Sequence, residues 1–357
     1  MLNMGGPKDL ASVESFLSEL FSDQEIIKLP FQNILGPLIS KRRTPKVREL
    51  YREIGGRSPI LEFTQLQGEG ITQRLDEQHP ESSPHKHYIG FRYVPPRIRD
   101  TLQQMADDGV RRVVAFSQYP QFSCTTTGSS LNELWRELND LGLQSHFEWS
   151  LIDRWPIHPS HINAVLHSIE KGFELFPDSV NRNEIRILFS AHSLPVTTIL
   201  KGDHYAGEVF ATVHAVMERY RSIHTTATHN LQPFYVCWQS QVGPKQWLSP
   251  QTEQVIRDLA ARQVKHMLVV PIAFTTDHIE TLSEIDIDFA KVAKQHGVEN
   301  FIRAPAFNDD PVAIQALTDV VKDHLDSQQH HSPLYPVHCP SCDNPMCRTI
   351  INPAQSF

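Results

Sequence analysis

Short apolar runs alternate with amphipathic segments along nearly the whole chain, and this alternation limits the fold more than any other feature. Apolar runs typical of strands cover residues 87–94, 112–117, 146–152, 185–189, 234–239, 267–274 and the region around 301. Apolar residues at helical spacing fill most of the intervals between them. Because strands that alternate with helices form parallel sheets with right-handed crossovers, the sequence predicts an α/β fold.

The length and the repeat of this pattern predict two domains. A chain of 357 residues is too long for one small core, and the alternation starts again after a break near residues 155–160. We expect two similar doubly wound, Rossmann-like domains at 1–155 and 156–328, followed by a cysteine-rich extension at 329–357. The crevice between the domains is then the expected ligand site.

The composition excludes some classes of function. The formal charge of −8 argues against a nucleic-acid partner. No run approaches the ~18 apolar residues that a membrane-spanning helix needs. The first residues, Met1–Met4, resemble the end of a strand whose beginning is missing, so we expect any targeting presequence to lie outside this chain.

The most informative stretch is Phe189–Pro195, which follows the apolar residues 185–189. The predicted strand places His192 at its carboxyl end, where ligands bind in parallel sheets. An imidazole with an ordinary pKa near ~6.5 exchanges protons at neutral pH. A lone histidine here is more often a core residue bonded to backbone, but a second polar element favours a catalytic role.

That second element is an acidic segment after the strand at 267–274. We expect a helix capped by Thr276 or Asp277, in which Glu280, Glu284 and Asp288 recur at four-residue steps and share one face. Such a row is usually a solvated surface. Its start at a strand end favours instead a path for a hard cation or for protons.

An apolar stretch at 26–40 is broken by Pro30, Gly36 and Pro37 and is followed by Lys41–Arg43. It is too irregular for an ordinary core helix. The sequence is compatible with a lip that dips into a membrane surface, where the basic residues meet anionic headgroups. A lid over an apolar ligand and simple core packing are the alternatives.

The tail places Cys339, Cys342 and Cys347 within nine residues, among prolines and without a core pattern. In a reducing compartment such thiols more often bind metal than form disulfides. Cys237 lies in a predicted strand and is expected to be buried and inert, so Cys124, in a loop, is the expected fourth ligand. The spacing fits zinc and an iron–sulfur cluster about equally.

Together these motifs resemble the ferrochelatase family of the eukaryotic, mitochondrial type, over nearly the whole chain. The matching segments are Leu2–Pro7, Lys41–Pro45, Ile89–Tyr93, Gln118–Gln121, Thr127–Ser130, Phe189–Ser193, Val242–Pro244 and Phe274–Glu280. The resemblance implies a metal chelatase, a lyase that inserts Fe²⁺ into protoporphyrin IX with release of two protons, as the terminal step of haem biosynthesis.

The resemblance also implies roles for individual residues. His192 accepts pyrrole protons or takes part in metal delivery, Glu280 is its partner, and Glu284 and Asp288 lead outward as a metal or proton path. The family usually has Glu where Asp288 stands, so the charge is kept with a shorter reach. Two further positions, His158 and Asp319, match residues counted as active in the family. Positions that match the porphyrin pocket are Met4, Arg43, Tyr51, Ser58, Arg92, Tyr93, Trp247, Phe274, Asp277 and His278.

The same resemblance makes Cys124, Cys339, Cys342 and Cys347 the ligands of a 2Fe–2S cluster. It implies a homodimer on the matrix side of the mitochondrial inner membrane, seated through the lip at 26–40. Two other functions remain as alternatives. One is an inactive haem- or porphyrin-binding protein of the same fold, and the other is an iron–sulfur electron carrier.

Overall fold

The computed structural model describes residues 1–224, 233–334, 339–341, 344 and 347. Contacts between backbone positions group the chain into two compact units. The first consists of Met1–Arg154 with Thr318–Phe357, and the second is Trp155–Leu317. The domain expected at 156–328 includes residues 318–328, which these contacts group with the first unit. The expected domain boundaries stay predictions.

The first unit contains short parallel strands and helices. Its elements are β1 (Leu2–Asn3), α1 (Val13–Ser22), α2 (Gln32–Glu53), α3 (Ile60–Gln78), the 3-10 turn η1 (Pro80–Ser82), β2 (Gly90–Phe91), α4 (Ile98–Asp107), β3 (Arg112–Phe116), the π-helical turn η2 (Cys124–Gly128), α5 (Ser129–Asp140) and β4 (Glu148–Ile152). Strand β1 pairs with β2, and β3 pairs with β4, both in parallel. The predicted strand at 87–94 is reduced to the two residues of β2, although the backbone N–H groups of Arg92 and Tyr93 still donate to Asn3 and Met4.

The segment at 26–40 is more regular than the sequence predicts. Helix α2 runs without a break from Gln32 to Glu53 and contains both Pro37 and Pro45. Thr44 and Pro45 favour the start of a separate helix, because proline suits a first turn, but α2 continues through both residues. Packing explains the continuity, since Gln32, Gly36, Ser40, Thr44 and Tyr51 form a buried stripe along α2.

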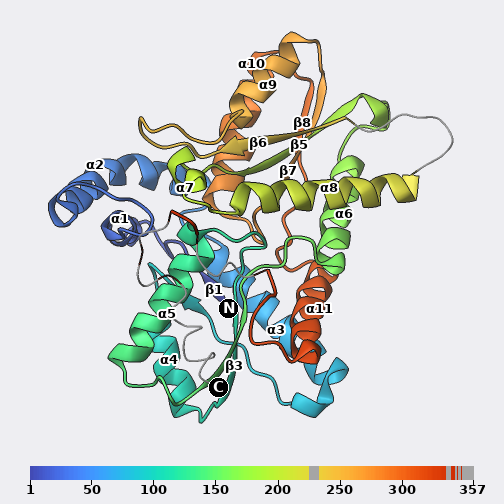
Figure 1. Ribbon diagram of the computed structural model, residues 1–357. Coiled ribbons are helices and arrows are strands. Elements are labelled where there is room, and N and C mark those ends of the chain that lie inside the picture. Colours follow the sequence, from blue (N-terminus) through green and yellow to red (C-terminus); the bar gives the residue numbers. More distant parts are fainter. Residues whose placement is uncertain (225–232, 335–338, 342–343, 345–346, 348–357) are drawn as a thin grey trace. The chain divides into compact units, whose positions relative to one another are not determined.

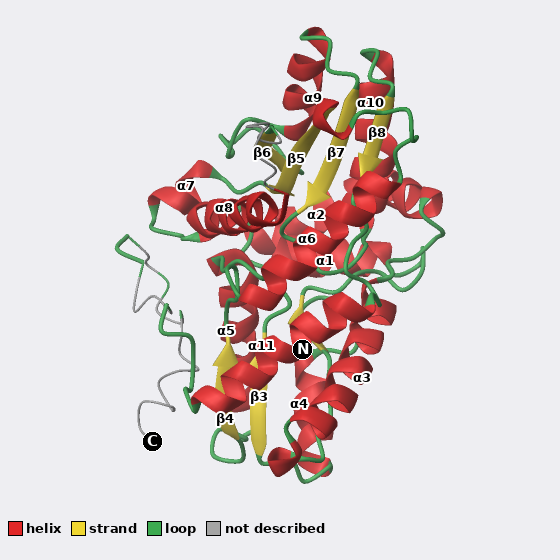
Figure 2. Ribbon diagram, turned by 90° about the vertical axis from the view of Figure 1, so that its right-hand side faces the viewer, coloured by secondary structure: helices red, strands yellow, loops and turns green. Residues whose placement is uncertain are grey.

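The second unit is built on one four-stranded sheet. Its elements are α6 (Pro159–Glu174), η3 (Arg182–Glu184), β5 (Ile185–His192), α7 (Val196–Leu200), α8 (Tyr205–His224), β6 (Phe234–Gln239), α9 (Thr252–Ala261), β7 (His266–Pro271), the π-helix η4 (Glu280–Phe289), α10 (Ala290–Gln295), β8 (Asn300–Arg303) and the start of α11 (Pro311–Ser327). The strand order is β6-β5-β7-β8, all parallel (Figure 2). The expected α/β fold with helix-flanked parallel sheets is confirmed.

Alternate residues of β5 enter two different cores, as the two-residue period of a strand requires. Ile187 and Phe189 pack with residues of α6 and α8, whereas Leu188 packs with residues of α9 and α10. Figure 1 shows these four helices around the sheet. Both faces of the sheet are therefore covered by helices. With neighbours on both sides, β5 is an interior strand, and its carboxyl end is held by the sheet.

The acidic segment is a π-helix and not the α-helix that its sequence predicts. Residues Glu280–Phe289 form η4, and no side chain of Thr276 or Asp277 caps its backbone. Asp277 instead accepts a hydrogen bond from the hydroxyl of Thr281 at 2.9 Å. In a π-helix each hydrogen bond spans five residues instead of the four of an α-helix.

Among the described residues, no helix combines the length and the apolar character that crossing a membrane requires.

Candidate active site

His192 lies where the sequence predicts it, as the last residue of β5. Its ring Nδ1 is 2.9 Å from Oε2 of Glu280, the first residue of η4. The side chains are partly exposed, 36% for His192 and 22% for Glu280, so the pair is open to a ligand. The structure thus brings together the two residues on which the sequence hypothesis depends.

The pair perturbs the protonation of both groups. Burial alone lowers the pKa of His192, but the charge and hydrogen bond of Glu280, helped by Glu284, outweigh it and the pKa is raised. Burial alone raises the pKa of Glu280, but His192 and then His278 outweigh it and the pKa is strongly lowered. The pair therefore holds a proton on the imidazole more tightly than a free histidine does, beside a carboxylate that stays ionised.

Glu284 lies further along η4 and is clamped by the end of strand β6. It accepts hydrogen bonds from Nε2 of Gln239 at 3.2 Å and from the N–H of Ser240 at 2.8 Å, and also from the Ser240 hydroxyl. Burial and the negative charge of Glu280 raise the pKa of Glu284, although the bonds from Ser240 oppose this. Glu284 therefore takes up a proton more readily than an ordinary glutamate does.

Asp288, the third predicted carboxylate, is exposed. Within the part of the chain that the structure describes, no hydrogen bond or ion pair joins it to Glu280 or Glu284. Asp288 therefore lies at the solvent-exposed end of the predicted row, whereas Glu280 and Glu284 are partly buried.

Gln239 and Ser240 are site residues that sequence reasoning missed. Gln239 is the register partner of His192 across β5 and β6, and its Nε2 also donates to the backbone oxygen of Glu280 at 3.1 Å. Ser240 has a φ of 67°, a left-handed conformation that points its N–H at Glu284. The available signal was position, since both residues end a predicted strand like the one that ends in His192.

The loop before η4 carries three other predicted residues. The rings of Phe274 and His278 lie 4.4 Å apart between centroids, and His278 Nε2 is 3.9 Å from Glu280 Oε2. Asp277 is held by Arg303 at 2.9 Å and by the side-chain amide of Asn308 at 2.8 Å. This loop therefore positions His278 beside the acidic partner of His192.

Two further predicted positions of the second unit are placed separately. Trp247 bridges to Pro195 near the end of β5, and its buried Nε1 has no hydrogen-bond partner among the described residues. His158 precedes α6, and its Nδ1 accepts the N–H of Ser160 at 3.3 Å. Trp247 therefore has a donor available for a ligand, whereas His158 caps a helix.

The predicted residues of the first unit fall into two groups. Arg92 and Tyr93 are buried in an ion network, in which Arg92 pairs with Asp23 and with Glu133, and the Tyr93 hydroxyl donates to Asp23 at 2.6 Å. Arg43 is half-buried, with its guanidinium 5.5 Å from the ring centroid of Phe21. The others are the half-buried Met4 and Asp319 and the buried Tyr51 and Ser58.

The cysteines differ in exposure. Cys237 is fully buried in β6, as expected, and its burial raises the pKa of the thiol to about 12. Cys339 is buried, and Cys124 and Cys347 are half-buried. Cys342 lies outside the described residues.

Comparisons with known proteins show the family of the whole chain. The family model for ferrochelatase matches residues 1–325. The chain is 50% identical over 374 residues to "Ferrochelatase, mitochondrial" of Dictyostelium discoideum. This alignment covers 100% of this chain and 88% of the relative. It is 49% identical over 349 residues to the proteins of the same name in Gallus gallus and Homo sapiens, covering 98% of this chain and 85% and 80% of the relatives. The chain belongs to the ferrochelatase family.

Proposed function

We propose that this chain inserts Fe²⁺ into protoporphyrin IX by using His192 and Glu280 as its proton-handling pair. The observation that carries the proposal is the 2.9 Å contact between these side chains at the carboxyl end of an interior parallel strand. Family membership makes the chain a metal chelatase, an enzyme of haem biosynthesis. It disfavours the two alternatives, an inactive haem- or porphyrin-binding protein and an electron carrier.

The reaction needs a base because protoporphyrin holds two protons on its pyrrole nitrogens, and both must leave when Fe²⁺ enters. A neutral His192 accepts such a proton, and the resulting imidazolium is stabilised by the carboxylate of Glu280. Glu284, whose pKa is raised, is the next acceptor along η4. The proton then leaves toward Asp288 and the solvent.

Iron handling follows from the same groups. Imidazole and carboxylate oxygens bind a ferrous ion without the strength of thiolates, which suits a substrate metal that must be passed on. We include His278, 3.9 Å from Glu280, in this set. We also keep His158 and Asp319 as active residues on the resemblance alone.

Porphyrin binding is proposed for residues of both units. Arg43 supplies a guanidinium for a propionate group, Trp247 supplies its unpartnered Nε1–H, and Phe274 supplies a ring face. Met4, Tyr51, Ser58, Asp277 and His278 complete the proposed set. Arg92 and Tyr93 are already engaged by Asp23, so we assign them to holding the pocket wall in place and not to direct contact.

A 2Fe–2S cluster is the proposed cofactor, held by Cys124, Cys339, Cys342 and Cys347. Four thiols are the usual donor set of such a cluster, and the described three are buried or half-buried as its ligands should be. Cys237 is unsuited because its Sγ is buried in the sheet, 3.5 Å from the backbone oxygen of Phe189. When bound, the cluster supplies one-electron redox chemistry.

The proposed setting is the matrix face of the mitochondrial inner membrane. The mitochondrial location follows the names of the relatives. Membrane seating is supported by Phe31, Ile34 and Leu38, which are 81%, 69% and 60% exposed at the start of α2, with exposed Lys41 and Arg42 nearby. A homodimer is proposed from the resemblance, and sedimentation equilibrium of the purified chain tests it.

The central test replaces His192 with alanine. We expect His192→Ala to abolish zinc or iron insertion into protoporphyrin while porphyrin binding, followed by quenching of tryptophan fluorescence, is retained. The insertion assay also separates the alternatives, because a binding protein or an electron carrier would not metallate the porphyrin. Near-normal turnover of the variant would refute the assignment of His192.

A further inference from the structure

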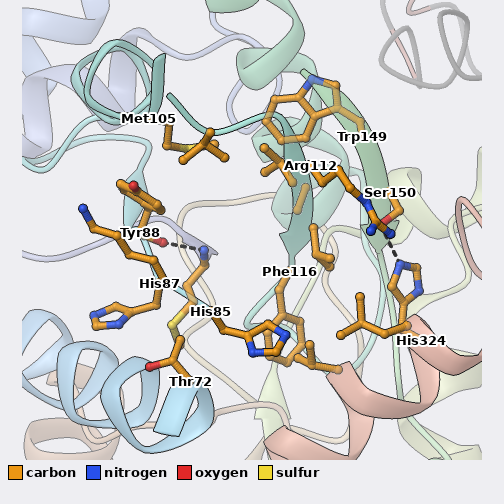
Figure 3. Close-up of a pocket in the computed structure, with 18 of the residues that line it drawn as sticks. Thr72, His85, His87, Tyr88, Met105, Arg112, Phe116, Trp149, Ser150 and His324 are labelled. Atoms are coloured by element: carbon orange, nitrogen blue, oxygen red, sulfur yellow. Dashed lines mark hydrogen bonds between the residues drawn. The ribbon is translucent and has the colours of Figure 1, made fainter. Parts of the chain in front are cut away.

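A large cavity is enclosed by residues of the first unit, and neither His192 nor Glu280 is among them. It has a volume of about 1020 Å³ and is lined by strands β3 and β4, helices α3, α4 and α11, and the segment between α3 and β2. Figure 3 shows His85 and Thr72 at one part of its wall, with Ser150 and His324 at another. The cavity gives ions and water access to side chains that are otherwise buried.

Three potential metal ligands converge at this cavity from two distant segments. His79 and Glu81 flank the start of η1, and Asp326 lies in the last turn of α11. His79 Nε2 is 3.2 Å from Glu81 Oε1 and 3.3 Å from Asp326 Oδ1. The three ligand atoms all lie within 4.8 Å of one another.

The orientation of the His79 ring is fixed by a chain of hydrogen bonds. His79 Nδ1 is 2.6 Å from Ser82 Oγ, which is 2.7 Å from His85 Nε2, and His85 Nδ1 is 2.7 Å from Asp76 Oδ1. Asp76 also accepts the backbone N–H of His85, and this bond lowers the pKa of its carboxyl, so Asp76 only accepts.

Because Asp76 only accepts, the donor and the acceptor of each hydrogen bond between Asp76 and His79 are fixed. With a neutral His85, the Nδ1 proton goes to Asp76 and leaves Nε2 to accept from the Ser82 hydroxyl. Ser82 in turn accepts from Nδ1 of His79. The Nε2 lone pair of His79 is therefore directed at two carboxylate oxygens, an arrangement that needs a cation between them. That cation is either a proton on Nε2 or a metal ion.

The distances are compatible with a shared metal ion. Ligands at ~2.0–2.2 Å from a tetrahedral zinc ion are separated from each other by roughly 3.4 Å. The observed 3.2 and 3.3 Å agree with this geometry.

Neighbouring hydrogen bonds orient two of the three ligands. Lys322 donates to the other oxygen of Asp326, Oδ2, at 2.6 Å, and so leaves Oδ1 directed toward His79. The Ser82–His85–Asp76 chain has the form of the outer hydrogen bonds that orient metal-binding histidines. The buried His79 is 7% exposed, whereas Glu81 and Asp326 reach the solvent.

We propose that His79, Glu81 and Asp326 form a binding site for a divalent first-row transition metal of the zinc class, separate from the iron-insertion site. Water from the cavity fills the remaining coordination positions. The ion links the segment after α3 to the end of α11, directly before the chain continues toward the cysteine tail. Its role is structural, since no residue assigned to iron insertion lies among its ligands.

Zinc counting on the full chain tests this site. Equilibrium dialysis against Zn²⁺, with bound metal measured by atomic absorption, should give one more zinc per chain for the wild type than for His79→Gln, Glu81→Gln or Asp326→Asn. Ser82→Ala keeps all three ligands and should weaken this zinc by about 10–100-fold through loss of ring orientation. Zinc bound elsewhere cancels, because the other sites are the same in every variant.

His214→Gln combined with Glu218→Gln is the matched control. This pair lies on the surface of α8 at 3.6 Å and changes the same residue types, so its zinc count should equal that of the wild type. Glu81 is 67% exposed, and its replacement therefore leaves the core intact, which melting curves recorded with a chelator verify. Equal zinc counts for the wild type and Glu81→Gln would overturn the proposal. A wild type stabilised only by falling pH, and not by Zn²⁺, would make the cation a proton.

Discussion

At the scale of single residues, the His192–Glu280 pair couples catalysis to pH. The raised pKa of His192 means that its contribution to stability is full below the ordinary value of ~6.5 and is lost as pH rises through the raised pKa. The lowered pKa of Glu280 means that its contribution is present above ~4.3 and is lost as pH falls. The pair therefore stabilises the fold most between these two values.

We expect Glu280→Gln to move the acid side of the pH profile of kcat/KM to lower pH. Without the carboxylate the imidazole binds its proton less tightly, so neutral His192 is present at lower pH. Removal of one adjacent charge corresponds to a shift of ~1–3 pH units. Rates of zinc insertion measured across the pH range provide the readout, together with a lower maximal rate.

Glu284→Gln is the control for this shift. Glu284 raises the pKa of His192 less than Glu280 does. The acid side of the kcat/KM profile of Glu284→Gln should therefore move in the same direction by a smaller amount. A Glu280→Gln enzyme whose acid side coincides with that of the wild type would show that His192 is not the titrating base.

His192 and Glu280 could be predicted because each follows an apolar strand, and parallel strands bring their carboxyl ends together. Gln239 and Ser240 follow a similar strand but were not predicted. Their role depends on the register of β6 against β5, which places Gln239 opposite His192. Register is set by packing across the sheet, and one strand's sequence does not contain that information.

At the scale of elements, the two errors in helix prediction have different physical causes. In α2, a buried stripe of small and polar residues keeps the helix continuous through Pro37 and Pro45, so tertiary packing overrides local propensity. In η4, the four-residue spacing of acids fits an α-helix, but the segment adopts π-helical hydrogen bonds. Composition does not distinguish these two windings.

Helix α6 tests the packing of the second unit. A Cβ added at Gly172 would lie 2.7 Å from Leu268 Cδ1 and 3.3 Å from Cα of Ala304, in a fully packed core. Although alanine favours helices, we expect Gly172→Ala to lower the free energy of unfolding by about 1–3 kcal/mol. Urea denaturation followed by circular dichroism measures the change.

Gly207→Ala in α8 is the matched substitution, because nothing lies within 4 Å of its added Cβ. Here only helix propensity acts, and we expect a gain of about 0.5–1 kcal/mol. If both variants gained stability, the close approach of α6 to the sheet would not limit packing.

The start of α2 tests the proposed membrane contact. Replacing Phe31, Ile34 and Leu38 together with serine should reduce binding to vesicles that contain anionic lipid by more than about tenfold, since each apolar side chain contributes on the order of 1.5–3 kcal/mol when buried. Vesicle co-sedimentation measures this loss. Leu175→Ser, at a side chain that is also largely exposed, should bind like the wild type. Equal binding of the triple variant would exclude this face of α2 as the contact.

At the scale of the whole molecule, the alternation of strands and helices was sufficient to predict an α/β fold with parallel sheets. The strand order β6-β5-β7-β8 was not predictable in the same way, because it reflects which strands pair in space. Strands β1 and β2 show that strand length was also not predictable from the sequence. Their sequence reads as longer strands, and only two residues of each are paired in the described chain.

The proposed cluster is tested on the intact protein. The purified chain should be brown, with a visible absorption band, and Cys124→Ser should lose the band because one of four thiolate ligands is missing. Cys237→Ser is the control and should keep the band, since this thiol is enclosed by the sheet. A colourless wild type with one zinc per chain, or a Cys124→Ser protein that keeps its colour, would contradict the assignment.

The two partners of the site pair differ in how firmly they are anchored. His192 ends a strand that is bonded to neighbours on both sides, whereas Glu280 opens a π-helical segment. If the contact opens during turnover, we therefore expect Glu280 to move and His192 to keep its position. Backbone amide hydrogen exchange should be slow along β5 and faster at the first turn of η4. His192 would then stay in place while Glu280 moves.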